Sequence, residues 1–271
     1  MQFNWTQENL DYHGRRVLED LRDLLKQEKF TERRRVRGLS KKEVVTEADI
    51  AAEDFVIKYL QANDIPVNLD GEEKRRTTLI QTPQGLWTLD PLDGTYSYFR
   101  GIFPYCSILS MFDSPHPENL GSAVWAGILN HDTGEIIATS QRLRTSERKT
   151  LEGMPGDAEA SVIVDLGPNQ KIEAYAPYAK IIESSWWRNI SSAGIHFFGI
   201  AKGSIDAYLC PVQKPEELVA GIPLIEIAGG AVLTYEGKRA GDLPYDFDKK
   251  YEIVAAATPE LAQRLVDLIK K

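Results

Sequence analysis

The sequence is poor in the residues that build disulfide scaffolds, zinc sites and membrane spans. Its 271 residues include two cysteines, Cys106 and Cys210, which are too few for a disulfide framework and fit a reducing compartment. The four histidines are scattered and have no cysteine neighbours, so a histidine-based zinc site is not expected. No stretch approaches the roughly 20 apolar residues of a membrane span, and charges interrupt the N-terminus where a secretory signal needs an apolar core. We therefore expect a soluble, cytoplasmic protein.

An excess of positive charge is also absent. The chain has 32 Lys and Arg against 40 Asp and Glu, which gives a formal net charge of −8. This balance argues against a nucleic-acid polymer as the main partner, because a phosphate backbone requires clustered cations. The motifs GxxxxGK[ST], GxSxG and HExxH do not occur. With 42% hydrophobic and 27% charged residues, the chain has an ordinary globular composition.

Hydrophobic spacing predicts two helices and several strands. Apolar residues at helical spacing indicate amphipathic helices over 5–28 and 47–60. Strand-like segments follow, including a pair joined by the turn sequence HDTG, and residues 150–160 are rich in small residues, typical of a connection. The segments expected as strands are 86–89, 107–112, 123–130, 135–141, 161–166, 179–185 and 205–210.

A basic stretch, FTERRRVRGLSKKE, separates the two predicted helices. It fits a solvated mobile loop, and it also fits a cationic loop near an anionic substrate, with Lys42 reaching the site. Its cations are Arg33, Arg34, Arg35, Arg37, Lys41 and Lys42.

The segment WTLDPLDGTYSYF places two carboxylates three residues apart. An apolar run leads into Asp90, so we expect Asp90 and Asp93 to emerge at the end of a strand, with Pro91 stiffening the chain between them. Gly94 and Thr95 suit a helix start whose free N–H groups point outward. Such an arrangement offers two metal-binding carboxylates beside a backbone anion cradle. A turn with an N-cap aspartate is the alternative.

Two further acidic clusters occur upstream. VVTEADIAAED carries Glu47, Asp49 and Glu53, and Glu72 and Glu73 follow Gly71. Taken alone, Asp49 fits an exposed helix residue and Glu72 a charged turn. Carboxylates about 4 Å apart repel by roughly 4 kcal/mol at an effective dielectric of 20, so a cluster either holds protons or binds cations. Hard oxygen ligands favour Mg²⁺, Mn²⁺ or Ca²⁺.

In this order, the motifs resemble those of the inositol monophosphatase-like family, the lithium-sensitive, magnesium-dependent phosphatases of the fructose-1,6-bisphosphatase superfamily. The T-x-x-D motif is matched at 46–49, the GEE turn at 71–73 and W-x-x-D-P-[IL]-D-G-T at 87–95. The likeness continues through SSAGIHFFGIAKGSIDAYL and AGIPLIEIAGGAVL, so it covers nearly the whole chain. It implies an α/β fold, a layered α-β-α-β-α sandwich. An α+β half over 1–150 would carry most of the metal ligands, and an α/β half over 151–271 would complete a site between the halves.

The resemblance also implies site roles. Two or three Mg²⁺ ions, or Mn²⁺, would be held by Glu72, Asp90, the carbonyl of Leu92, Asp93 and Glu217. A metal-activated water, oriented by Glu72 and Thr95 with Asp49 behind, would attack phosphorus. Phosphate and substrate contacts would come from Gly94, Thr95, Ser192 and Ala193. Lithium sensitivity and a homodimer are implied in the same way.

The chain departs from the family pattern in the C-terminal half. Glu217 stands where the family has the aspartate ligand, and Pro223 lies inside the predicted helix, where it removes a hydrogen bond and kinks the segment. Glu217 could instead be an acidic residue favoured at a helix start after Pro215. Cys210 and His196 replace acidic residues of other members, so inositol itself is not supported as the preferred substrate.

The resemblance implies a Mg²⁺-dependent phosphomonoesterase of a small polyol, sugar or nucleotide phosphate. Fructose-1,6-bisphosphate and 3′-phosphoadenosine 5′-phosphate both stay open as substrates. No membrane partner is expected. The alternative is a catalytically impaired homologue that serves as a binding or regulatory partner.

Overall fold

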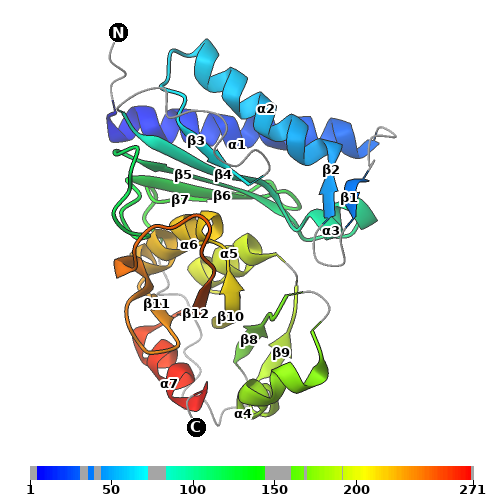
Figure 1. The fold of residues 1–271 in the computed structure, drawn as a ribbon, viewed down its shortest axis with the longest axis vertical. Helices are drawn as coiled ribbons and strands as arrows, with labels where there is room; N and C mark the ends of the chain where they lie inside the picture. Colours follow the sequence, from blue (N-terminus) through cyan, green and yellow to red (C-terminus); the bar gives the residue numbers. More distant parts are fainter. Residues whose placement is uncertain are drawn as a thin grey trace. The chain divides into compact units, whose positions relative to one another are not determined.

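The computed structural model describes residues 5–30, 36–39, 44–72, 84–143, 160–167, 170–190 and 192–269. The chain divides into unit 1, residues 1–118 with 122–141, and unit 2, residues 119–121 with 142–271 (Figure 1). Of the connection expected at 150–160, residues 150–159 lie outside the described residues. The predicted domain boundary at 150 therefore stays a prediction. No helix within the described ranges is long and apolar enough to cross a membrane.

Unit 1 is built on a five-stranded sheet. In spatial order its strands are β3 (Leu69–Gly71), β4 (Leu86–Asp93), β5 (Cys106–Phe112), β6 (Trp125–Asn130) and β7 (Ile136–Ala138). The pair β3–β4 is parallel and the other pairs are antiparallel. A separate two-stranded sheet pairs β1 (Val36–Leu39) with β2 (Val44–Thr46). Of the basic stretch, residues 33–35, 41 and 42 lie outside the described residues, so the predicted role of Lys42 stays a prediction. Arg37 lies in β1.

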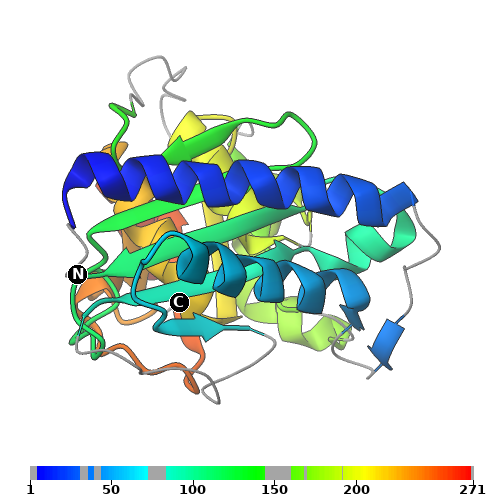
Figure 2. The ribbon, with the colours of Figure 1, turned by 90° about the horizontal axis from the view of Figure 1, so that it is seen from above.

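Two long helices, α1 (Gln7–Phe30) and α2 (Glu47–Ala62), lie side by side over one face of this sheet (Figures 1 and 2). Both were predicted from their apolar spacing. The apolar stripe of each helix is buried against the sheet, which forms one core. This core includes Leu10, Val17, Leu18, Leu21, Ala52, Val56, Leu60, Trp87, Leu89, Leu109, Trp125 and Leu129.

A close approach between α1 and β6 depends on Gly14. A Cβ built on Gly14 would overlap the ring of Trp125, which is fully buried. We expect Gly14→Ala to lower the free energy of unfolding by about 1–3 kcal/mol, because the buried indole has little room to move. Urea unfolding measures this change, and Glu19→Ala on the exposed side of α1 is the control. Equal stability of the two variants would contradict the prediction.

Unit 2 contains a second five-stranded sheet. Its strands in spatial order are β11 (Ala231–Thr234), β12 (Tyr251–Ala256), β10 (Ala207–Gln213), β8 (Ser161–Val164) and β9 (Trp186–Arg188). The strands β10, β8 and β9 are parallel, whereas β12 is antiparallel to both of its neighbours. A 3₁₀ turn, η2 (Ala240–Asp242), follows β11.

The two faces of this sheet bury different partners. Leu209 belongs to a core shared with η1 (Ile172–Tyr178), α4 (Ala179–Glu183) and α7 (Pro259–Ile269). Neighbouring residues of a strand point to opposite faces, so Tyr208 lies on the other side. There its ring contacts those of His196 and Phe197, at centroid distances of 4.4 and 5.5 Å. Both of these residues come from α5 (Ala193–Lys202), which packs beside α6 (Pro215–Ile227).

The strand expected over 179–185 was wrong, since α4 occupies most of this segment. Ile181 is buried while its neighbours along the chain are partly or fully exposed. The hydroxyl of Ser185 donates to the Ile181 carbonyl at 2.7 Å and so satisfies an open group at the helix end. A short apolar run fits a helix and a strand alike, and here the strand begins only at Trp186.

Candidate active site

The two carboxylates of DPLD are brought together by a β-bulge. Asp90 lies opposite Ile108 and Asp93 opposite Cys106, so β4 has one residue more than β5 over this interval. In a regular strand, residues three apart point to opposite faces, and one extra residue returns them to the same side. Oxygen atoms of the two carboxylates lie within 4.8 Å of each other. The strand β4 extends to Asp93, beyond the end that we expected at residue 89.

Side chains hold the backbone of this bulge. The Ser107 hydroxyl donates to the Pro91 carbonyl at 2.6 Å, and Nε2 of His131 lies 2.8 Å from the same hydroxyl oxygen. The Leu92 carbonyl accepts from the Thr95 hydroxyl at 2.9 Å. Sequence reasoning missed Ser107 and treated His131 as a turn residue, because no spacing pattern connects them to Pro91.

Asp49 is buried at the start of α2, only 1% exposed, so the alternative of an exposed helix residue was wrong. Its Oδ2 accepts from the amide and the hydroxyl of Thr46 at 2.7 and 2.5 Å, a capping box that explains the T-x-x-D spacing. Its Oδ1 lies 3.1 Å from the hydroxyl of Thr95. The helix start thus aims one carboxylate oxygen at Thr95.

The electrostatics of Asp49 follow from this burial. Loss of solvent raises the pKa of Asp49 to about 6, the Thr46 hydrogen bonds oppose the rise, and the negative charge of Glu72 adds to it. Glu72 follows β3, is partly exposed, and donates its amide to the Leu89 carbonyl at 3.1 Å. The carboxylates of Glu72 and Asp49, both in unit 1, therefore interact electrostatically. Glu73 lies outside the described residues.

The hydroxyl of Thr95 lies between two hydrogen-bond acceptors. Its hydroxyl has one proton and lies within hydrogen-bond distance of both Asp49 and the Leu92 carbonyl. It is the first residue of the short helix α3 (Thr95–Arg100), after Gly94 in the left-handed region at φ 89°. The helix start expected after Gly94 is confirmed.

A thiol contacts the carboxylate of Asp93. The Sγ of Cys106, which is fully buried, lies 3.4 Å from Oδ2 of Asp93. Cys106 and Cys210 both lie within the described residues, and neither is part of a disulfide. Sequence reasoning gave Cys106 no role, and its place opposite Asp93 follows from the strand register alone.

The remaining predicted site residues lie in unit 2. Ser192 is the N-cap of α5, where its hydroxyl accepts from the amide of Ile195 at 3.4 Å, and Ala193 is the first residue of that helix. Glu217 lies in the first turn of α6, 7% exposed. That helix continues through Pro223 to Ile227.

The oxygen atoms of unit 1 fit a hard divalent cation. Asp90 and Asp93 are 1% and 8% exposed, and two ionised carboxylates at this separation are unfavourable without a compensating charge. Carboxylate and carbonyl oxygens are the ligands that Mg²⁺, Mn²⁺ and Ca²⁺ prefer. The carboxylates of Asp90 and Asp93 supply such oxygens.

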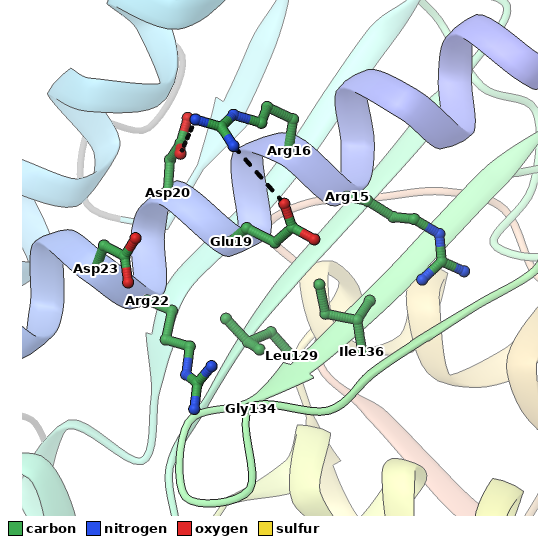
Figure 3. A pocket seen from close by; sticks show the side chains of 9 residues that line it. All are labelled: Arg15, Arg16, Glu19, Asp20, Arg22, Asp23, Leu129, Gly134 and Ile136. Carbon is green, nitrogen blue, oxygen red and sulfur yellow. Dashed lines mark ion pairs between the residues drawn. The ribbon is translucent and has the colours of Figure 1, made fainter.

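A surface hollow of about 430 Å³ lies elsewhere in unit 1, between α1 and the hairpin that joins β6 to β7 (Figure 3). Arg16 pairs there with Asp20 at 3.0 Å, and Arg22 extends over the turn at Gly134. Three arginines and three carboxylates line it, so its formal charges balance. Its lining residues are Arg15, Arg16, Glu19, Asp20, Arg22, Asp23, Leu129, Gly134 and Ile136.

Comparison with known proteins finds that this chain is similar to phosphatases of one family. A protein of Archaeoglobus fulgidus, described as a fructose-1,6-bisphosphatase/inositol-1-monophosphatase, is 26% identical over 271 residues, covering 95% of this chain and 96% of that one. An IMPase of Thermotoga maritima superposes with a TM-score of 0.74 at 18% identity over 97% of both chains. An IMPase/NADP phosphatase solved with Mg²⁺ and phosphate gives a TM-score of 0.72 at 16% identity, over 95% of both chains.

These superpositions confirm the predicted α/β fold class of the inositol monophosphatase type. The model of the inositol monophosphatase family matches residues 13–271, which include every motif described above. Since this match spans nearly the whole sequence, the chain belongs to the inositol monophosphatase family.

Proposed function

We propose that this metal-dependent phosphatase hydrolyses a small sugar, polyol or nucleotide phosphate with Mg²⁺. The observation that carries the proposal is the placement of Thr95 between Asp49 and the Leu92 carbonyl, next to the buried pair Asp90 and Asp93. This arrangement combines oxygens for a hard cation with a path for a proton.

Glu72, Asp90, Asp93 and the Leu92 carbonyl would hold the metal, and Glu217 would complete the set from unit 2. Bound Mg²⁺ lowers the pKa of a coordinated water and neutralises charge on the phosphate. Mn²⁺ suits the same oxygens. Family structures contain Mg²⁺ and phosphate, and the number of ions per site in this chain stays a prediction, as do lithium sensitivity and a homodimer.

The protein moves the proton of the attacking water through Thr95. The Thr95 oxygen can accept that proton in a hydrogen bond while its own proton turns toward Asp49 Oδ1 at 3.1 Å. Asp49 is the acceptor for that proton by its geometry, since its Oδ1 faces the Thr95 hydroxyl, and in the metal-free protein burial raises its pKa to about 6. Thr46 holds the other oxygen of Asp49, which fixes the orientation of the carboxylate.

The substrate contacts follow the family resemblance. The amides of Gly94 and Thr95 would hold phosphate oxygens, since Gly94 at positive φ turns the chain sharply before α3. Ser192 and Ala193 would contact the rest of the substrate. Cys210, buried at the end of the DAYLC segment, lacks the charge of the acidic residue that inositol-specific members carry there, so inositol phosphate is not favoured as the substrate.

Phosphate release from a substrate panel tests the proposal. The panel contains inositol-1-phosphate, fructose-1,6-bisphosphate, glycerol-2-phosphate, 3′-phosphoadenosine 5′-phosphate and NADP, each assayed across a Mg²⁺ titration. We expect Mg²⁺-dependent release that is strongest for a sugar or nucleotide phosphate. Release independent of Mg²⁺, or none from any compound by the folded protein, would contradict the proposal.

The alternative is a binding or regulatory homologue, and the observation that favours it is Glu217 at the position of an aspartate ligand. The number of bound Mn²⁺ ions separates the two. Anomalous diffraction from a Mn²⁺-soaked crystal should show two or more sites in an enzyme, one of them at Glu217. A single site without Glu217 favours the alternative.

A further inference from the structure

Glu217 belongs to a hydrogen-bonded series of three buried side chains, all in unit 2. The hydroxyl of Tyr208 donates to Oε1 of Gln213 at 2.7 Å, and Nε2 of Gln213 donates to Oε2 of Glu217. Tyr208, Gln213 and Glu217 are 1%, 2% and 7% exposed. We call this series the Tyr208–Gln213–Glu217 relay.

A second bulge makes the relay possible. Cys210 lies opposite Ile253 and Gln213 opposite Tyr251, so β10 has one residue more than β12 over this interval. Tyr208 and Gln213 are five residues apart and would face opposite sides of a regular strand. The extra residue returns them to the same side, where the hydroxyl reaches the amide.

Only one orientation of the Gln213 amide satisfies both neighbours. A carboxylate accepts hydrogen bonds and a phenol hydroxyl can donate one, so Nε2 must face Glu217 and Oε1 must face Tyr208. Burial raises the pKa of Tyr208 well above its usual value, which keeps the proton on the donor. Gln213 is thereby fixed at both ends of its amide.

The relay orients a side chain that is longer than the family's aspartate. Glutamate has one more methylene and one more rotatable bond, which must be held for a ligand to keep one position. Among the described residues, the side-chain amide of Gln213 and the main-chain amide of Lys214, at 3.3 Å, both donate to Oε2 of Glu217. Together they set the rotation of the carboxylate and therefore the direction of Oε1.

We propose that Gln213 is a positioning residue that holds Glu217 in the orientation of a metal ligand, and that Tyr208 holds Gln213. This inference rests on the proposed function, in which Glu217 is a ligand. The chain thus offsets the longer glutamate with a buried amide on the preceding strand. A purely structural role for the relay would stabilise the start of α6 and leave metal affinity unchanged.

Mn²⁺ titration of the metal-free, full-length protein tests this, with free Mn²⁺ followed by electron paramagnetic resonance. The site that contains Asp93 is the one lost in Asp93→Asn. We expect Gln213→Leu to weaken this site about 10–100-fold, the usual effect of removing a group that orients a ligand. The control is Gln263→Leu, because Gln263 also donates to a carboxylate four residues on, that of Asp267 at 3.0 Å, on the exposed surface of α7.

A double-mutant cycle shows whether Gln213 acts through Glu217. The shorter side chain of Glu217→Asp does not reach Gln213 in the same way, so Gln213→Leu should have little further effect on Mn²⁺ affinity in that background. Equal effects in both backgrounds would overturn the proposal. Tyr208→Phe keeps the test decisive if Gln213→Leu does not fold, and we expect it to weaken the same site about 3–10-fold.

The failure of the inference differs from the failure of the proposed function. If wild type binds Mn²⁺ and releases phosphate, but Gln213→Leu and Tyr208→Phe bind Mn²⁺ as Gln263→Leu does, the relay is structural only. If Asp93→Asn removes no Mn²⁺ site and wild type releases no phosphate, the proposed function fails, and the inference with it.

Discussion

Asp93→Asn is expected to reduce Mg²⁺-dependent phosphate release by about 10³-fold or more. The asparagine has the shape of the aspartate but lacks its charge, so it offers the cation one neutral oxygen beside Asp90. Several kcal/mol of transition-state stabilisation by a metal correspond to such a factor. Steady-state assays at saturating Mg²⁺ measure it, and a Mn²⁺ titration should show the loss of one site.

Asp113→Asn is the matched control for this change. Asp113 is exposed just past the end of β5, in the same sheet as Asp93. We expect its activity and thermal unfolding to equal those of wild type. Activity of Asp93→Asn within tenfold of the control would remove Asp93 from the metal site.

Asp49→Asn is expected to stabilise the metal-free protein while it lowers activity about 10²–10⁴-fold, the usual contribution of a general base. The folded protein raises the pKa of Asp49 from 3.8 to about 6, so between these values it binds a proton that the unfolded chain has released. Stability from this group therefore falls as pH rises from 3.8 to 6, and the full cost is present above 6. That cost is about 3 kcal/mol at most, and the asparagine does not carry it.

Thermal unfolding of the metal-free proteins at pH 4 and pH 8 measures this effect. The variant and wild type should unfold alike at pH 4, where Asp49 is protonated, and the variant should be more stable at pH 8. In wild type the activity should fall below an acid midpoint at or below pH 6. A variant less stable than wild type at pH 8 would show that burial of the charge is not the dominant cost.

The sequence predicted the elements whose periodicity is long or whose turns are distinctive. The helices α1 and α2 were predicted because their apolar stripes extend over several turns, and the β6–β7 pair because HDTG marks its turn. Segment 179–185 was predicted wrongly because five helical residues are too short for their spacing to distinguish a helix from a strand.

The candidate site was predictable only where its residues lie in motifs. Thr46 and Asp49 form a capping box within one helix turn, so their contact follows from local sequence. Strand register and bulges place Cys106, Ser107 and Gln213 at their contacts. Both depend on pairing between segments that are distant in the sequence. No local pattern marks an extra residue in a strand, so these contacts required the structure.

The bulge in β4 also explains why the motif reads D-x-x-D. A regular strand would bring two aspartates to one side at the spacing D-x-D, but its carbonyls would stay committed to the neighbouring strands. With the odd spacing, the carbonyls of Pro91 and Leu92 instead accept from side-chain hydroxyls, those of Ser107 and Thr95. The extra residue of the bulge thus makes backbone carbonyls that would otherwise pair with neighbouring strands part of a binding surface. Deleting one residue between Asp90 and Asp93 would therefore leave the sheet its pairing partners and deprive the enzyme of a main-chain oxygen.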